Sequence, residues 1–149
     1  MEALSKKSSW SASETRDFLS TFNGPLRIAT TTESGFPMIC SLWYQYMDGH
    51  IHCATQQDAV LVRHLKRDGR CAFEFSPNAP PYFGLRGRGT ATVSKMGAEE
   101  ALEQISSRYL GNSDSPLKNW LLKRSADEVR IEIVPSWMTT WDYRERMSR

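Results

Sequence analysis

LRIATTTESGFPMICSLWYQYMDGHIHCAT, residues 26–55, contains three apolar segments separated by two turn sequences. The segments are rich in β-branched and aromatic residues, which favour strands. Glu33-Ser34-Gly35 and Met47-Asp48-Gly49 provide the residue types that tight turns prefer. The stretch therefore predicts a meander of three strands, at residues 26–32, 38–46 and 50–55.

The rest of the chain continues this pattern, with helices between further strands. Ser11 and Glu14 have the spacing of a capping box, which predicts a short helix before the meander. Three prolines within residues 77–81 predict a loop, because proline cannot donate a hydrogen bond in a central strand. Further strands are expected at 70–76, 82–95, 129–134 and 137–143, and further helices at 58–67, at 98–110 and from Ser115. Five or six mostly antiparallel strands with a few short helices predict a mainly β protein, a small barrel.

Length and charge exclude several classes of protein. The 149 residues contain no repeat and no linker, so we expect a single domain, residues 1–149. The formal net charge is only +2, whereas nucleic-acid-binding proteins usually carry a concentrated basic face. No window approaches the roughly 18 apolar residues of a membrane span, and the N-terminal residues have no apolar signal segment. We therefore expect a cytoplasmic protein with neither a nucleic acid nor a membrane as partner.

Cysteine and histidine residues are the first candidates for chemistry. Cys40, Cys53 and Cys71 fall in apolar strand segments, which predicts reduced core thiols without a reactive role. His50 and His52 share one face of a predicted strand, but further metal ligands would have to come from distant segments. No nucleophile motif such as G-x-S-x-G occurs. We therefore predict no catalytic residue and no metal site.

Arg86 and Arg88 flank Gly87 in the longest predicted strand, so both side chains point to the same face of the sheet. Two interpretations remain open for this pair. The arginines either form a solvated face, or they line a groove for an anionic ligand, to which the neighbouring glycines allow close approach.

Several short motifs follow one another in an order that resembles a known family. They are Ile28-Ala29-Thr30-Thr31, Gly35-Phe36-Pro37, Trp43-Tyr44, Asp48-Gly49, Ala54-Thr55, Arg63-His64-Leu65, YFGLRGRG at 82–89 and Thr140-Trp141-Asp142-Tyr143. Over residues 26–143 the chain resembles the pyridoxamine 5′-phosphate oxidase-related, flavin-binding split-barrel family. The resemblance implies a six-stranded split β-barrel and a homodimer. It also implies two sites at the subunit interface for FMN or the related deazaflavin coenzyme.

The resemblance also implies which residues contact the cofactor. In such proteins the second strand lies along the flavin ring and ribityl chain, and the end of the third strand contacts ring and phosphate. The flavin supplies the chemistry, so the protein needs no general acid or base of its own. The expected cofactor-binding residues are Ile39, Cys40, Ser41, Leu42, Ala54, Thr55, Gln56, Gln57, Val60, Leu61, Arg86, Arg88 and Trp141.

At the start of the helix after the third strand, the chain departs from the family pattern. The family commonly carries Ser-Arg-Lys where this chain has Ala59-Val60-Leu61. Each lost cation removes a charge-assisted hydrogen bond to phosphate, worth about 1.5–3 kcal/mol. Asp58 is expected to cap the helix, which would occupy the backbone donors and repel a phosphate. The remaining donors are backbone N–H groups, Thr55, Gln56 and Gln57, with Arg63, Arg86 or Arg88 as replacement cations.

Three functions are consistent with this pattern. The first is an FMN-dependent oxidoreductase that acts on an unidentified small molecule. The second is a reductase that uses the deazaflavin coenzyme. The third is a degenerate, non-enzymatic barrel that binds another ligand or none, with Val60 and Leu61 as packing residues. Pyridoxamine phosphate oxidase activity itself is not expected, because residues 141–146 do not show that enzyme's arginine-rich motif.

Overall fold

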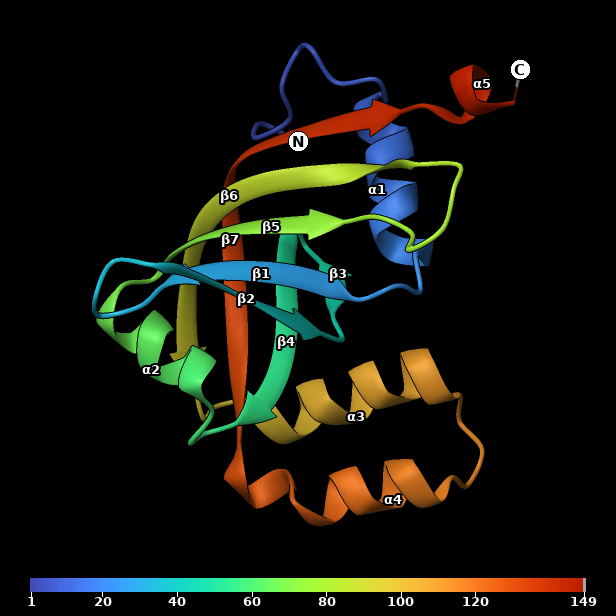
Figure 1. The fold of residues 1–149 in the computed structure, drawn as a ribbon. Helices are drawn as coiled ribbons and strands as arrows, with labels where there is room; N and C mark the ends of the chain where they lie inside the picture. The colour runs from blue at the N-terminus through green and yellow to red at the C-terminus, as the bar shows by residue number, and fades with distance from the viewer. Residues whose placement is uncertain (149) are drawn as a thin grey trace.

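One curled antiparallel sheet forms the body of the protein in the computed structural model, which describes residues 1–148 (Figure 1). Its strands are β1 (Leu26–Thr31), β2 (Pro37–Leu42), β3 (Gln45–Met47), β4 (His50–Gln56), β5 (Arg70–Phe75), β6 (Phe83–Ser94) and β7 (Glu128–Asp142). They lie in the order β2-β1-β5-β6-β7-β4-β3, and every neighbouring pair is antiparallel. The predicted mainly β split barrel is confirmed.

The sheet has seven strands where the resemblance implied six, and the strand boundaries differ at two places. The strand predicted at 38–46 is divided into β2 and β3 at Trp43 and Tyr44. Tyr44 is fully buried there, and its hydroxyl donates a hydrogen bond to the backbone oxygen of Leu19 (2.8 Å). Conversely, the two strands predicted at 129–134 and 137–143 form the single strand β7. Their pairing with β6 shifts between Arg88 and Gly89, which accommodates an extra residue on β7.

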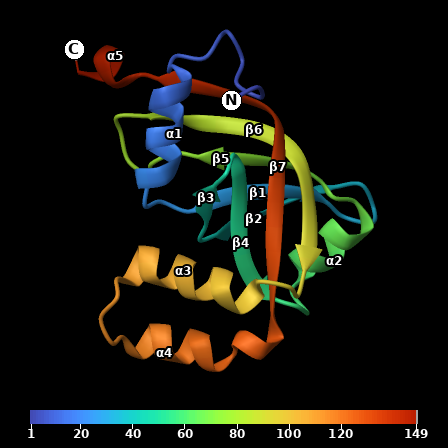
Figure 2. The same cartoon turned by 180° about the vertical axis from the view of Figure 1, so that it is seen from behind.

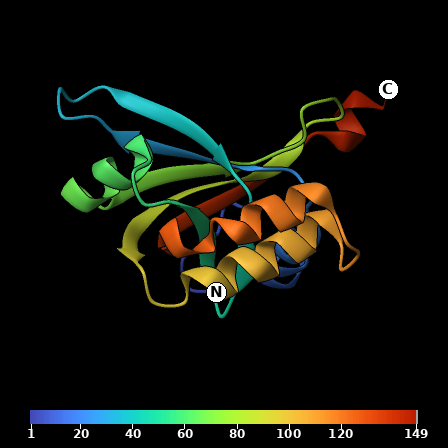
Figure 3. The same cartoon turned by 90° about the horizontal axis from the view of Figure 1, so that it is seen from below.

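Helices cover the ends of this sheet (Figure 2). They are α1 (Ala12–Thr21), α2 (Val60–Arg67), α3 (Ala98–Leu110), α4 (Pro116–Lys123) and α5 (Arg144–Met147), with a 3₁₀ turn at Ser125–Asp127. α3 packs against β4 and β7, and α4 lies beside α3 as an outer layer (Figure 3). Within residues 1–148, no helix has both the length and the apolar composition that a membrane crossing requires.

Alternate strand residues point into the curl of the sheet and form the core. The burial of β1 alternates along the strand, as expected for a strand with one buried face. Arg108 of α3 joins this core to α1, because its guanidinium donates to the backbone oxygens of Tyr44 (3.1 Å) and Phe22 (2.7 Å). The largest core side chains include Leu26, Ile28, Tyr44, Ile51, Phe75, Leu85, Ile131 and Ile133.

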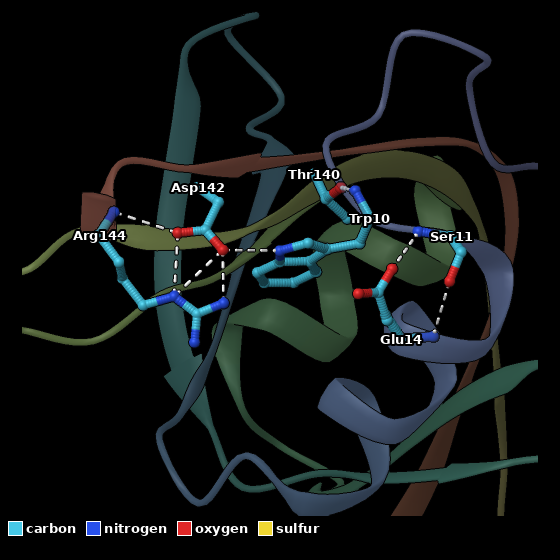
Figure 4. Close-up of polar contacts among 6 residues, drawn as sticks. All are labelled: Trp10, Ser11, Glu14, Thr140, Asp142 and Arg144. Carbon is cyan, nitrogen blue, oxygen red and sulfur yellow. Dashed lines mark hydrogen bonds and ion pairs between the residues drawn. The ribbon is translucent and has the colours of Figure 1, made fainter. Parts of the chain in front are cut away.

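The N-terminal segment is fastened to the end of β7 (Figure 4). The Trp10 indole donates to Oδ2 of Asp142 (2.9 Å), and the Trp10 backbone donates to the Thr140 hydroxyl (2.9 Å). Arg144 pairs with Asp142 and, together with the Trp10 hydrogen bond, holds the pKa of that carboxyl well below its usual range. The predicted capping box of Ser11 and Glu14 is present in the structure, with both reciprocal hydrogen bonds.

Candidate functional site

The ends of β2 and β4 line a cavity of about 490 Å³. β2 is at one end of the strand order and β4 is near the other, so the curl of the sheet brings them together. This strand side of the cavity contains the predicted cofactor residues Ser41, Leu42, Ala54, Thr55 and Gln56.

Helices α3 and α4 form the opposite, apolar wall of this cavity. Trp120 and Leu117 on α4 are exposed large apolar side chains. Such exposed apolar surface often marks a ligand-binding groove, and flat apolar walls suit a planar ring system. The lining from these helices comprises Leu102, Ile105, Leu117, Trp120 and Leu121.

A short chain of polar groups closes one end of the cavity. The Gln56 side chain donates to Oε1 of Glu128 and accepts a hydrogen bond from Arg124 (3.1 Å). The Arg124 guanidinium also lies over the Trp120 ring, 4.6 Å from its centre. Glu128 is only 4% exposed, and burial raises the pKa of its carboxyl. Its second oxygen, Oε2, is buried and has no hydrogen-bond partner within residues 1–148.

Arg124 is a cavity residue that sequence reasoning missed. It lies on the chain just after α4, far from the predicted cofactor strands, and no local motif marks it. Its position depends on the packing of α4 beside α3 and on the pairing of β7 with β4. None of the replacement cations proposed from sequence lines this cavity.

The junction between β4 and α2 differs from the expectation in one respect. The predicted cap, Asp58, is wrong, because Ala59 occupies the N-cap position and makes no side-chain cap hydrogen bond. The first helical N–H group with a backbone acceptor is that of Val62, which donates to the oxygen of Ala59 (3.0 Å). The N–H groups of Val60 and Leu61 have no acceptor in the described part of the chain. Two backbone donors at a helix start are therefore available to an anion.

The two residues that replace the family's cations lie in different environments. Val60 is 44% exposed, whereas Leu61 is 4% exposed and belongs to the hydrophobic core. Leu61 is therefore a packing residue, and Val60 is a surface residue at the helix start.

A second cavity, of about 480 Å³, lies on another face of the sheet and contains Ile39, Arg86 and Arg88. The strand register places Ile39, Ala29, Ala72, Arg88 and Trp137 in one row across five strands. We call this surface the outer face. Arg88 lies over the Trp137 ring (5.9 Å to its centre), and Arg86 lies over Trp141 (5.6 Å). A Cβ on Gly87 would come within 2.6 Å of the Trp137 backbone oxygen, which explains the glycine between the two arginines.

The remaining predicted site residues line neither of these two cavities; they are Cys40, Gln57, Val60, Leu61 and Trp141. The Cys40 side chain packs against the core, and the Gln57 side chain is exposed and donates to Asp127 (3.4 Å). The structure thus separates the predicted residues into a group between β2 and β4, a group on the outer face, and residues outside both.

The three cysteines are expected to react slowly in the native protein, because the thiolate is the reactive form. Burial raises the pKa of Cys53, which is fully buried, and raises the pKa of Cys71 to about 11. Cys40 is half-buried, and burial raises its pKa too, so it should label first of the three. Timed alkylation at neutral pH, followed by peptide mapping with and without denaturant, measures the three rates. Rapid native labelling of Cys53 would contradict this prediction.

The curled sheet, parted between β2 and β4 and covered by helices at one end, is the split barrel of pyridoxamine 5′-phosphate oxidase-like proteins. Conserved hypothetical protein Rv2991 from Mycobacterium tuberculosis is similar to this chain, with a TM-score of 0.76 and 24% identity over 97% of this chain and 92% of that one. An F420 reductase matches with a TM-score of 0.69 and 18% identity, over 83% and 94% of the two chains. A Listeria innocua protein assigned as a pyridoxamine 5′-phosphate oxidase matches with a TM-score of 0.59 and 16% identity, over 78% of this chain and 87% of that one.

At these identities the likeness establishes the fold alone. No protein-family model and no curated protein matches the sequence.

Proposed function

We propose that the protein binds a flavin-type cofactor between β2, β4 and the helices α3 and α4, and that it catalyses oxidation or reduction of a small molecule. The observation that carries the proposal is the cavity at the ends of β2 and β4, together with the open helix start that follows β4. FMN is the cofactor that we expect first.

The residues present fit such a cofactor. The Thr55 hydroxyl lines the cavity, and the N–H groups of Val60 and Leu61, at the start of α2 and outside the cavity lining, are further donors that a phosphate group would use. The apolar wall, with Trp120, suits the flat ring system. A bound flavin supplies the electron or hydride transfer, and the protein binds it, orients it and excludes water.

The deazaflavin coenzyme is the second candidate. One of the solved structures with this fold is an F420 reductase, which supports a deazaflavin for this chain as well. Both cofactors carry a phosphate, so the same helix start would serve either one.

We further propose that the protein is a homodimer whose subunits meet through the outer face. Ile39 and Trp137 are 69% and 39% exposed on this face. A surface of this kind is costly to leave in water, and a second copy related by a twofold axis would cover it.

Titration of FMN and of deazaflavin F420 into the purified protein tests the cofactor proposal. Thr55→Val removes one hydroxyl donor at the cavity and should weaken binding about tenfold, which corresponds to one hydrogen bond to a charged group. Thr92→Val, an exposed position on β6, is the matched control and should leave the affinity unchanged. Failure of both cofactors to bind would favour a degenerate barrel with another ligand.

A further inference from the structure

Two histidines and a carboxylate that are distant in sequence lie together on β4 and β7. His50 and His52 occupy the same face of β4, and the strand register pairs His52 with Glu132 of β7. The potential ligand atoms of these three residues all lie within 4.8 Å of one another. The sequence shows no third candidate metal ligand close to the two histidines, and the pairing of β4 with β7 provides one, Glu132.

The surroundings already orient the three side chains. His50 Nδ1 lies 2.7 Å from Oε1 of Glu132, and Arg130 binds the other carboxylate oxygen, Oε2 (3.2 Å). His52 is only 6% exposed.

We propose that His50, His52 and Glu132 bind a divalent metal ion of the zinc type. Zinc sites commonly use imidazole nitrogen and carboxylate oxygen, and three protein ligands leave the fourth position for water. To enclose an ion at tetrahedral spacing, the three ligand atoms would have to approach one another from their present separations of up to 4.8 Å by side-chain rotation. The Arg130 contact fixes the carboxylate in the way that outer hydrogen-bond partners of metal ligands do. This site is independent of the cavity proposed for the flavin.

A route for the ion is also present. A cavity of about 430 Å³ opens beside His50 and is lined by two carboxylates, Glu2 and Asp48, and by the guanidinium of Arg16, which offsets part of their charge. Negative groups at an entrance raise the local concentration of cations. Arg130 acts in the opposite direction, because its charge repels the ion, so we expect an affinity below that of closed four-ligand zinc sites.

Calorimetric titration with Zn²⁺, after treatment of the full-length protein with a chelator, tests the proposal. One ion per chain should bind, and the melting temperature should rise because the metal binds only the folded state. Glu132→Gln and His50→Gln are near-isosteric changes at partly exposed positions, and each should weaken binding about tenfold or more, since loss of even an outer partner costs that much. Glu103→Gln, at an exposed position on α3, and His64→Gln are matched controls for loss of a carboxylate and of a histidine outside the cluster, and both should retain binding.

Replacement of Zn²⁺ by Co²⁺ identifies the ligands independently of fold stability. A tetrahedral site with nitrogen and oxygen ligands gives intense visible bands without thiolate-to-metal charge transfer. The proposal is overturned if the wild type binds no stoichiometric Zn²⁺. It is equally overturned if the Glu132 and His50 variants bind as tightly as the controls, or if a thiolate band shows that a cysteine holds the ion.

Discussion

Leu61→Lys is expected to lower the free energy of unfolding by about 3 kcal/mol or more, because it replaces a core side chain with a buried, unpaired ammonium. Leu61 is almost fully buried among the core residues. Urea denaturation measures the loss. The matched control is Leu61→Met, which preserves apolar volume and should cost less than about 1.5 kcal/mol.

Val60→Arg, one residue earlier, is expected to tighten the binding of FMN and not to destabilise the fold. Val60 is exposed at the helix start, so an arginine there remains in solvent and adds a cation next to the two free N–H groups. The gain should be about 1 kcal/mol, or about fivefold in the Kd of FMN, because solvent screens the charge. Binding titrations at low and high salt measure it, and the gain should shrink as salt rises.

Val60→Met provides the control for side-chain length without charge. It should leave the FMN affinity unchanged at both salt concentrations. If Val60→Arg binds FMN no better than Val60→Met while the protein remains folded, the phosphate does not lie at the start of α2. The cofactor would then bind in another orientation or not at all.

Ile39→Arg is expected to convert the proposed dimer into monomers. Ile39 lies at the edge of the outer face, in the row that also contains Arg88. In a twofold dimer each substitution occurs twice across one interface, so two further cations would be added to a face that already carries Arg86 and Arg88. The dissociation constant should rise about a hundredfold or more, since loss of a large apolar anchor together with the added charge costs about 2 kcal/mol or more per copy.

Sedimentation velocity at micromolar protein measures this change. Gln104→Arg adds the same charge at an exposed position on α3 and should leave the dimer intact. A monomeric wild type would contradict the dimer itself. A dimeric Ile39→Arg protein would instead place the interface on a different surface.

Local sequence patterns determined most of the secondary structure. The turns at Glu33-Ser34-Gly35 and at Met47-Asp48-Gly49 separate strands as predicted, and Gly35, Asp48 and Gly49 all have the positive φ that such residues tolerate. The capping box at Ser11 depends only on residues three apart, so the sequence shows it directly. The mainly β class could therefore be predicted from the residues, whereas the split barrel was implied by the resemblance of the motifs to a known family.

Tertiary packing decided the features that local preference does not contain. The strand predicted at 38–46 is interrupted because Tyr44 is drawn into the core, where its hydroxyl finds backbone acceptors at the end of α1. The different burial of Val60 and Leu61 depends on which side of α2 faces the sheet, and adjacent residues on a helix point in directions about 100° apart.

The composition of both candidate sites is likewise a property of the folded sheet. The pairing of β7 with β4 places Glu128 beside Gln56 and Glu132 beside His52, although these residues are far apart in the chain. The packing of α4 beside α3 then brings Arg124 to the same cavity. The sequence alone determined the strand that carries His50 and His52. Only the closure of the sheet decided which charges face them, because strand pairing between distant segments depends on the whole core.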